Sequence, residues 1–259
     1  MLIKGLEEFG FKYGISGAHS ARSMMIAELS ELLLQYPQGA PVRTLKSDIV
    51  DFNVLHKPTA NSRKMTFRHL MDLYGLDNEI CLFRNFLRLW TQANETTRPI
   101  LAFQLAFCRD PLLRVALPVL VGIHPGESVS REQTEALIEH YNPGAYSAAS
   151  LKSFAQNING SLTQSGFMAG KNRKIRSQAG VGAVNVAFAL FIAYLGGQEG
   201  SLAMRSEWLT MLGLNRDELI ALAQGAHSRG LIKFINASDV MEIRFPDWLT
   251  ETEKELLNG

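Results

Sequence analysis

The stretch SAASLKSFAQNINGSLTQSGFMAGKNRKIR (Ser147–Arg176) predicts a helix followed by a basic loop or wing, meaning a hairpin beside a helix. Apolar residues recur in it at the spacing of one helix face. These residues are Leu151, Phe154, Ala155, Ile158 and Leu162. The opposite face carries polar side chains with few fixed charges, and Gly166 can end the helix in a left-handed cap. The basic segment around Gly170 follows directly.

Positive charge is concentrated around this stretch. From residue 140 to residue 198 the chain has no Asp or Glu, yet it has five basic residues: Lys152, Lys171, Arg173, Lys174 and Arg176. Because the whole chain is formally +1, the other residues together carry about −4. Amide side chains can read base edges and basic side chains can neutralise phosphates, so this pattern suits DNA. A surface helix followed by a solvated basic loop has the same pattern, and the sequence leaves both open.

Length and composition indicate a globular chain of one large or two small domains. It has 259 residues, of which 46% are apolar and 20% are charged. Cys81 and Cys108 lie in apolar helical patterns without CxxC spacing, so we predict buried thiols and no disulfide or zinc site. Glu7 and Glu8 stand where a signal peptide would need an apolar core. We therefore expect a cytoplasmic protein.

Two apolar segments could be mistaken for membrane spans. Residues 100–123 contain Arg109, Asp110 and Arg114, and residues 181–195 fall short of the roughly 20 residues that a bilayer needs. Both are predicted to be core helices, and no membrane contact is expected.

Helices are predicted over residues 20–36, 42–52 and 59–74, the first and third opened by a Ser and a Thr cap. The third is basic toward its N-terminus, so the last two form a plausible helix-turn-helix. Any helical hairpin of an all-α protein gives the same pattern, and Asp72 on the same face weakens the DNA interpretation. Further helices are predicted at 78–94, within 99–123 as two helices separated at Asp110-Pro111, and at 130–141, where Ser130 and Gln133 have the spacing of a capping box.

The C-terminal residues 199–259 form a separate zone with a formal charge of about −4. They predict a helix over 201–212, a second helix from Asn215 to Gly230, and strands 231–235 and 241–245 joined by residues 236–239. Helix, helix and hairpin in that order describe a winged helix. The outer face of the second helix is nearly uncharged: Ala221, Gln224, Gly225 and Ser228. We therefore predict a protein-contact module here and not a DNA reader.

The predicted fold class is mainly α: a multi-helix globular protein with helix-turn-helix units and a small C-terminal β-hairpin that is winged-helix-like. The expected divisions are a helical domain with an N-terminal helix-turn-helix (1–141), a basic helix-turn-helix or wing region with a core helix (142–198), and the winged-helix-like module (199–259).

Catalytic patterns are weak in this chain. The six histidines are scattered without metal-binding spacing, and there is no GxSxG. Residues 166–172 resemble a phosphate loop but are one residue short, and Asn172 stands where Ser or Thr must hold magnesium. We predict no enzyme, no cofactor and no metal.

Two runs in the first third of the chain carry a resemblance: ARSMMIAELSELL (Ala21–Leu33) and DFNVLHKPTANSRKMTFRHLMDLYGLD (Asp51–Asp77). Within them the pattern residues are Asn53, Leu55, Lys57, Thr59, Ala60, Arg63 and Arg68. In this layout the segment Ser20–Leu76 resembles the small helical BrxA proteins of BREX phage-exclusion systems. The resemblance implies an all-helical monomer with helix-turn-helix units, binding to double-stranded DNA, and a non-catalytic accessory role in a methyltransferase-centred defence complex. The C-terminal module has no match in that pattern.

The leading hypothesis is a sequence-tolerant DNA-binding accessory protein. Its expected phosphate contacts are Arg63, Lys64, Arg68, Lys171, Arg173, Lys174 and Arg176, with Lys152 beside them. Its expected base-edge contacts are Asn61, Gln156, Asn157 and Gln164. One alternative is a scaffold subunit that assembles other members of a defence complex. Another is a helix-turn-helix transcriptional regulator, which would need a symmetric dimer. The sequence does not decide whether the two basic regions share one face.

Overall fold

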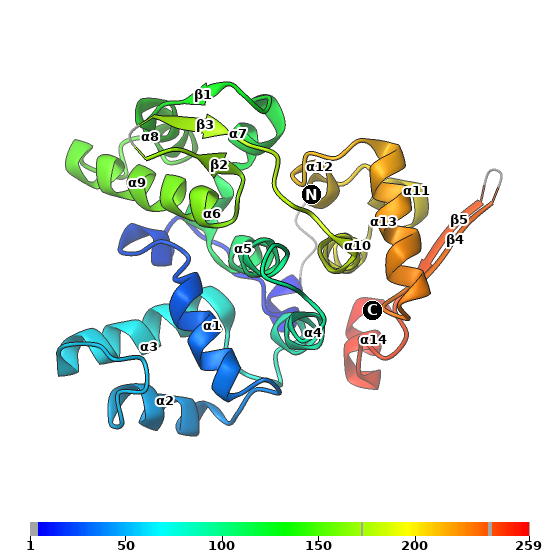
Figure 1. The fold of residues 1–259 in the computed structure, drawn as a ribbon, viewed down its shortest axis with the longest axis horizontal. Coiled ribbons are helices and arrows are strands. Elements are labelled where there is room, and N and C mark those ends of the chain that lie inside the picture. The colour runs from blue at the N-terminus through cyan, green and yellow to red at the C-terminus, as the bar shows by residue number, and fades with distance from the viewer. Residues whose placement is uncertain (1–4, 172, 238–239, 259) are drawn as a thin grey trace.

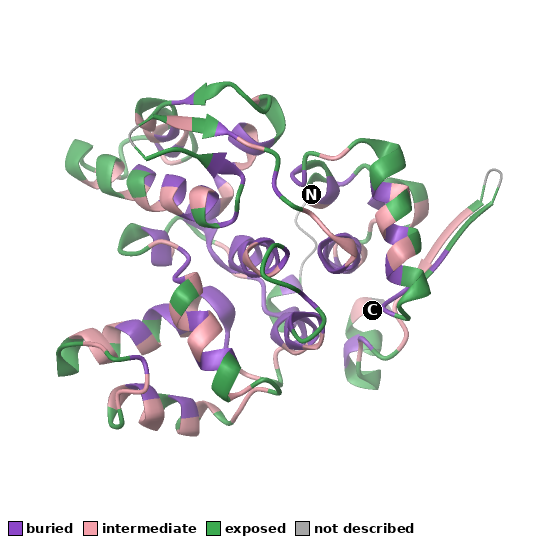
Figure 2. Cartoon of the chain, viewed as in Figure 1, coloured by how far each residue is buried: buried purple, intermediate pink, exposed green. Residues whose placement is uncertain are grey.

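Three mutually packed helices form the centre of the fold: α4 (Cys81–Trp90), α5 (Arg98–Arg109) and α10 (Ala183–Leu195). The computed structural model describes residues 5–171, 173–237 and 240–258. In it α5 and α10 are seen end-on in the middle of Figure 1, and Figure 2 shows them buried on nearly all sides. A helix enclosed on all sides is apolar all round. That explains why these segments resemble membrane spans, although none of the described helices is long and apolar enough to cross a bilayer.

The first lobe of the fold, at the lower left of Figure 1, holds α1 (Ile26–Gln35), α2 (Val42–Val50) and α3 (Ala60–Tyr74). Two short 3₁₀ helices precede it, Leu6–Phe9 (η1) and Ala18–Ser20 (η2). The predicted third helix is confirmed at both ends. Thr59 and Ser62 form a reciprocal capping box at its start, and Gly75 ends it in a left-handed conformation.

The predicted start of the first helix is wrong, because α1 begins at Ile26 and not after Ser20. The Ser20 hydroxyl donates to the Gly17 carbonyl and caps no helix. Met25 has a left-handed φ of 51°, and the Met24 amide donates across to Ser161 at 2.8 Å. Residues 21–25 are therefore a connecting segment that touches a helix far along the chain.

The second lobe, at the upper left of Figure 1, combines three helices with a three-stranded antiparallel sheet. Its elements in order are α7 (Leu117–Gly122), β1 (Ser128–Val129), α8 (Arg131–Tyr141), α9 (Ala148–Gln164), β2 (Met168–Ala169) and β3 (Lys174–Arg176). The sheet order is β1-β3-β2, with Ser128 opposite Ile175 and Met168 opposite Arg176. The short helix α6 (Pro111–Arg114) links this lobe to α5.

This second lobe crosses the expected boundary between residues 141 and 142. Strand β1 pairs with β3, and α8 packs along α9, so elements from both sides of that boundary lie together. The sequence did not predict β1, which has only two residues and a pairing partner more than forty residues away. The predicted capping box of α8 is confirmed, since Ser130 and Gln133 cap each other.

The third lobe, on the right of Figure 1, contains α11 (Gly200–Ala203), α12 (Glu207–Thr210), α13 (Arg216–Ser228), β4 (Lys233–Ala237), β5 (Val240–Arg244) and α14 (Glu251–Asn258). The predicted single helix over 201–212 is wrong. It divides at residues 204–206 because the Ser206 side chain accepts from the Leu209 amide and begins a new helix.

The predicted C-terminal hairpin is confirmed as an antiparallel pair with Lys233 opposite Arg244 and Ala237 opposite Val240. Ser238 and Asp239 of its expected turn lie outside the described residues. The mainly helical fold with a small C-terminal hairpin therefore stands as predicted.

Candidate nucleic-acid interface

Helix α9 presents a polar stripe to solvent and an apolar stripe to the core. Lys152, Ser153 and Gln156 are exposed, whereas Ile158 and Leu162 are fully buried. The Ser147 side chain caps the helix, and its first turn contains no acid. The positive end of the helix dipole is therefore not countered by a local carboxylate. This arrangement agrees with the two faces that the sequence predicts.

The basic segment after α9 is a β-hairpin formed by β2 and β3. Gly170 has a φ of 91°, and a Cβ atom there would lie 2.1 Å from the Arg173 carbonyl oxygen. The turn therefore requires glycine at this position. Lys171 and Arg173 are exposed, and the Lys174 Nζ donates to the Gly170 carbonyl at 2.8 Å. Three cations thus lie at the tip of the hairpin.

A groove of about 640 Å³ lies between α9, the start of α8 and this hairpin, and we call it the α9–hairpin groove. The polar or basic side chains that line it include Ser128, Ser130, Gln156, Asn159, Lys171, Arg173 and Lys174. Its acid, Glu132, accepts from Arg131 at 2.7 Å, and Arg131 also contacts Glu135 at 2.5 Å. The hairpin cations therefore supply the positive charge of the groove.

Arg176 is a correction to the predicted phosphate contacts, because it is a buried structural residue with 2% of its surface exposed. Its guanidinium donates to the carbonyls of Phe167 (3.0 Å), Ser177 (2.6 Å) and Leu120 (3.1 Å) and lies over the Phe167 ring. Burial lowers the pKa of Arg176. It fastens the hairpin to α7 and does not point toward a ligand.

Two amides predicted to contact bases are engaged within the protein. The Asn157 Nδ2 donates to the His19 carbonyl at 2.9 Å, so this side chain is half-buried and turned inward. The Gln164 Nε2 donates to the Ser23 hydroxyl at 3.2 Å, although the Gln164 side chain remains exposed. Gln156, on the outer face of α9, is exposed and has no hydrogen-bond partner among the described residues.

A buried hydrogen-bonded network of Ser161, His19 and Asp110 connects α9 with η2 and the start of α6. The His19 Nδ1 lies 2.8 Å from the Asp110 carboxylate, and its Nε2 lies 2.7 Å from the Ser161 hydroxyl. These two hydrogen-bond distances match those between the residues of a hydrolase triad. Burial raises the pKa of Asp110, but the charge and hydrogen bonds of His19 outweigh it, so the pKa lies below its usual value.

The surroundings of these three side chains indicate that their role is structural. All three side chains are buried, the Met24 amide donates to the Ser161 oxygen, and that hydroxyl also contacts the Asn157 carbonyl at 3.1 Å. A nucleophile enclosed in this way has no room for a substrate carbon. The three residues are 91 and 142 positions apart, so no local sequence signal could reveal them.

Helix α3 carries the other predicted basic region. Asn61, Lys64 and Arg68 are exposed along one stripe, and Arg68 lies 4.0 Å from Asp72. Arg63 is half-buried and donates to the Asp51 carbonyl at 3.3 Å, so it joins α3 to α2. Lys64 and Asn61 thus remain the members of this set without a side-chain partner among the described residues.

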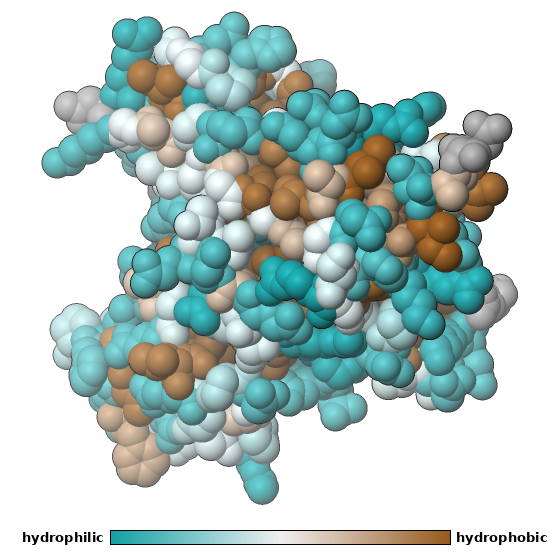
Figure 3. Space-filling model, turned by 45° about the vertical axis from the view of Figure 1, so that its right-hand side comes forward, coloured by the Kyte–Doolittle hydropathy of each residue, from teal (hydrophilic) through white to brown (hydrophobic). Residues whose placement is uncertain are grey.

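The two predicted regions lie in different lobes on the same side of the molecule (Figure 1). Helix α9 projects from the upper lobe and α3 from the lower one, and both contact η2 between them. Figure 3 shows a hollow in the outline between these lobes. One extended ligand could therefore contact both helices.

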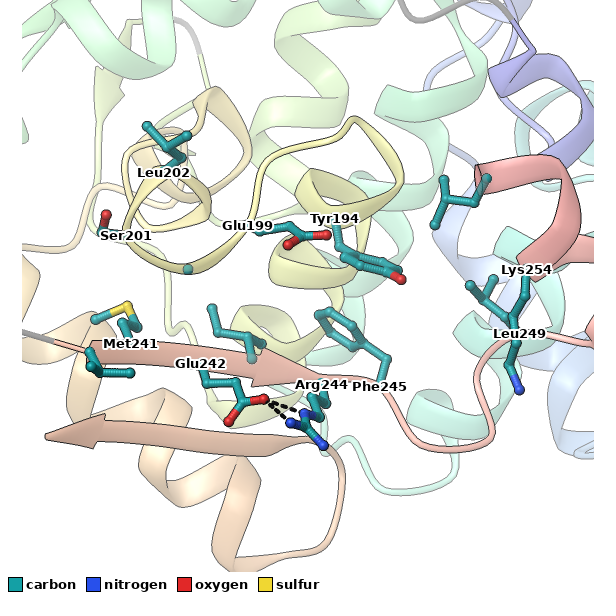
Figure 4. Close-up of a pocket in the computed structure, with 14 residues that line it drawn as sticks. Tyr194, Glu199, Ser201, Leu202, Met241, Glu242, Arg244, Phe245, Leu249 and Lys254 are labelled. Carbon is teal, nitrogen blue, oxygen red and sulfur yellow. Dashed lines mark hydrogen bonds and ion pairs between the residues drawn. The ribbon is translucent and has the colours of Figure 1, made fainter. Parts of the chain in front are cut away.

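The third lobe has a different surface. On α13 the exposed residues Ala221, Gln224 and Ser228 are uncharged, as predicted. A groove of about 810 Å³ runs between β5, α14 and the start of α11. Figure 4 shows Leu202 and Met241 at one end of it and Tyr194, Phe245 and Leu249 at the other.

The described residues contain no candidate metal site and no reactive thiol. Within 5–171, 173–237 and 240–258, no group of three or more His, Cys, Asp or Glu is placed to hold a metal ion. Both cysteines are buried and free, as predicted, and burial raises the pKa of Cys81 to about 12. Neither thiol is therefore suited to act as a nucleophile at neutral pH.

Neither a protein-family model nor a curated protein matches this chain.

Proposed function

We propose that this protein is a non-catalytic double-stranded DNA-binding protein that holds the duplex in the α9–hairpin groove. The observation that carries the proposal is the groove itself. It places the exposed amide of Gln156 on one wall and the cations Lys171, Arg173 and Lys174 on the other. Amides contact base edges, and cations neutralise the phosphates that flank a groove of DNA.

The order of elements in the second lobe supports this function. Helix, strand, helix, helix and hairpin, from α7 to β3, is the order of a winged-helix unit. In such a unit the second helix of the helix-turn-helix enters the major groove. That position is occupied here by α9, which has a polar outer face without acids. The hairpin β2–β3 would then lie along the adjacent backbone.

The chemistry of the groove favours sequence-tolerant binding. Three of its contacts are cations suited to phosphates, and one exposed amide remains for base edges because Asn157 is turned inward. Phosphate contacts carry no sequence information of their own. The resemblance of Ser20–Leu76 to BrxA proteins adds the proposal that the DNA-bound protein serves as an accessory subunit of a phage-defence complex.

Fluorescence anisotropy on several unrelated duplexes tests the DNA assignment. The hairpin variant Lys171→Ala, Arg173→Ala, Lys174→Ala is expected to lose on the order of tenfold or more in affinity, about equally for every duplex. The control variant changes three exposed cations of the third lobe, Arg205→Ala, Arg216→Ala and Lys233→Ala. It is expected to bind as the wild type does. Equal affinities for the two variants would contradict the assignment of the groove.

A second candidate function is attachment to other protein subunits through the third lobe. It is favoured by the groove of Figure 4, at whose rim the apolar side chains Leu202 and Val240 are each 64% exposed. Exposed apolar side chains beside a groove are typical of protein contacts. Under this function a partner subunit would co-purify with the wild type and be lost from the Leu202→Asp, Val240→Asp variant, with DNA binding unaffected. Retention of the partner by that variant would contradict it.

A further inference from the structure

A second cavity lies between the two predicted DNA-binding helices. It measures about 410 Å³ and is bounded by the start of α1, the N-terminal half of α3 and the end of α9. Its potential hydrogen-bond donors come from three separate segments: Arg22, Ser23, Lys57, Ser62, Thr66 and Gln164. Gln164 of the second lobe thus faces a cavity shared with α3 of the first. We call this cavity the interlobe cavity.

Arg22 is the principal charge of the interlobe cavity. Its side chain is exposed and forms no ion pair with any described residue. The acid that lines the cavity, Glu28, contacts Lys57 at 2.8 Å and is neutralised by it. An unpaired guanidinium suits a phosphate group. The Ser23 hydroxyl beside it accepts from Gln164 and keeps its own proton to donate.

His69 does not line the cavity, but it lies close enough to Arg22 for that charge to lower its pKa, so it can report on an anion bound beside Arg22. It follows Thr66 by one turn of α3 and is 7% exposed, and its Nδ1 is enclosed without a hydrogen-bond partner in the described part of the chain. Burial lowers the pKa of His69, and the charges of Arg22 and Arg68 lower it further, while Asp72 opposes them. Asp72 itself contacts Lys12 at 3.1 Å. An anion beside Arg22 would offset the positive field at this imidazole.

We propose that the interlobe cavity binds a backbone phosphate of duplex DNA through Arg22, with the surrounding hydroxyls as further donors. The inference rests on the proposed function and extends it. The duplex would cross from the α9–hairpin groove over Arg22 to the exposed stripe of α3. It would then contact Lys64 and Asn61. The sequence predicts both as DNA contacts but does not show whether they lie on the same side of the molecule as α9. Arg22 was not among the predicted contacts because no other Lys or Arg lies near it in the sequence.

The test compares Arg22→Gln with Arg205→Gln, which changes an exposed arginine of the third lobe. Arg22→Gln is expected to weaken binding to every duplex by roughly three- to tenfold and to reduce the salt slope by about 0.9, the loss of one phosphate contact. Arg205→Gln should change neither quantity. Because Arg22 is exposed, both variants should keep the wild-type melting temperature.

NMR of the His69 ring identifies the source of the phosphate. Duplex DNA is expected to raise the pKa of His69 in the wild type and to change it less in Arg22→Gln. Inorganic phosphate is the second probe. If it raises the pKa while the duplex affinity of Arg22→Gln stays that of the wild type, the cavity binds free phosphate and the DNA inference is overturned. Wild-type affinity in Arg22→Gln with no response to either probe also overturns it.

The results expected if the protein does not bind DNA are different from these. In that case the wild type would show no salt-dependent binding to duplex DNA, and the hairpin variant would behave as the wild type does. If the hairpin variant weakens binding and Arg22→Gln does not, the α9–hairpin groove stands and the interlobe cavity has no part in holding DNA.

Discussion

The molecule contains the same local arrangement twice, with different surfaces. In the second lobe α9 is followed by the hairpin β2–β3, and in the third lobe α13 is followed by the hairpin β4–β5. The first hairpin exposes Lys171 and Arg173 near its turn, whereas the second exposes Ile235 (50%) and Val240 (64%) near its turn. The cations of the second hairpin, Lys233 and Arg244, lie at its far end, and Arg244 is paired with Glu242.

Helices α9 and α13 also differ in the charge of their first turns. The first turn of α13 holds Asp217 and Glu218, whereas that of α9 has no acid. A helix N-terminus attracts phosphate, and carboxylates in the first turn cancel that attraction. The comparison teaches that the backbone arrangement alone does not define a DNA-binding unit. Under the proposed function, the acid-free start of α9 and the cations of its hairpin distinguish the second lobe from the third.

The largest expected effect comes from removing the buried anchor of α9. Asp110→Ala leaves His19 without its carboxylate and removes the cap of α6, whose Leu112 and Leu113 amides donate to Asp110. The free energy of unfolding is expected to fall by about 3–5 kcal/mol, as for other broken buried pairs. Urea denaturation measures this loss. Asp217→Ala on α13 is the control and should change stability by less than about 1 kcal/mol. Similar small changes for both variants would contradict the anchoring role.

The second-largest expected effect distinguishes the roles of two arginines in the hairpin β2–β3. Arg176→Ala removes a buried guanidinium from three carbonyl acceptors and is expected to destabilise the protein by about 2–4 kcal/mol. Arg173→Ala removes an exposed side chain, so it should leave stability within about 0.5 kcal/mol and weaken DNA binding instead. Paired urea melts and anisotropy titrations check both. The division of roles is wrong if Arg176→Ala is as stable as the wild type.

The smallest effect is a dependence of stability on pH. Burial and Arg22 lower the pKa of His69 in the folded protein, so the unfolded chain binds this proton more tightly. The contribution of His69 is therefore fully present above the ordinary histidine pKa of about 6.5 and is lost as the pH falls from there through the lower pKa of the folded state. Urea melts between about pH 7.5 and 5 should show a shallower pH dependence for His69→Gln than for the wild type. An identical dependence would show that His69 does not couple to folding.

Local signals predicted much of the fold. The capping residues Thr59 and Ser130 and the terminating Gly75 are short-range features, and each helix end that they predict is confirmed. The start of α1 was missed because Ser20 is a good cap whose hydroxyl bonds elsewhere. Strand β1 was missed because a two-residue strand has no period and depends on a distant partner.

The candidate site was predicted in position but not in every residue. Lys171, Arg173, Lys174 and Arg176 are equivalent as charges, yet strand alternation places Arg176 inward while Ile175 on the same strand is 36% exposed. From hydrophobicity alone, one would predict that Ile175 is buried and that Arg176 is exposed. Asn157 is turned inward because residues 19–24 pack against α9, a contact between segments about 140 positions apart. The interlobe cavity forms where the start of α1, α3 and the end of α9 approach one another, and this tertiary arrangement has no local sequence signal.

One salt series tests the central claim most directly. Anisotropy of a random-sequence duplex is measured with the wild type, the hairpin triple variant and the third-lobe triple variant at increasing salt. The wild type is expected to show a steep linear fall of log affinity with log salt. The hairpin variant should lose about 2.7 of that slope, and the third-lobe variant should lose none. No wild-type binding at low salt, or equal slopes for both variants, would contradict a DNA-binding role for the α9–hairpin groove.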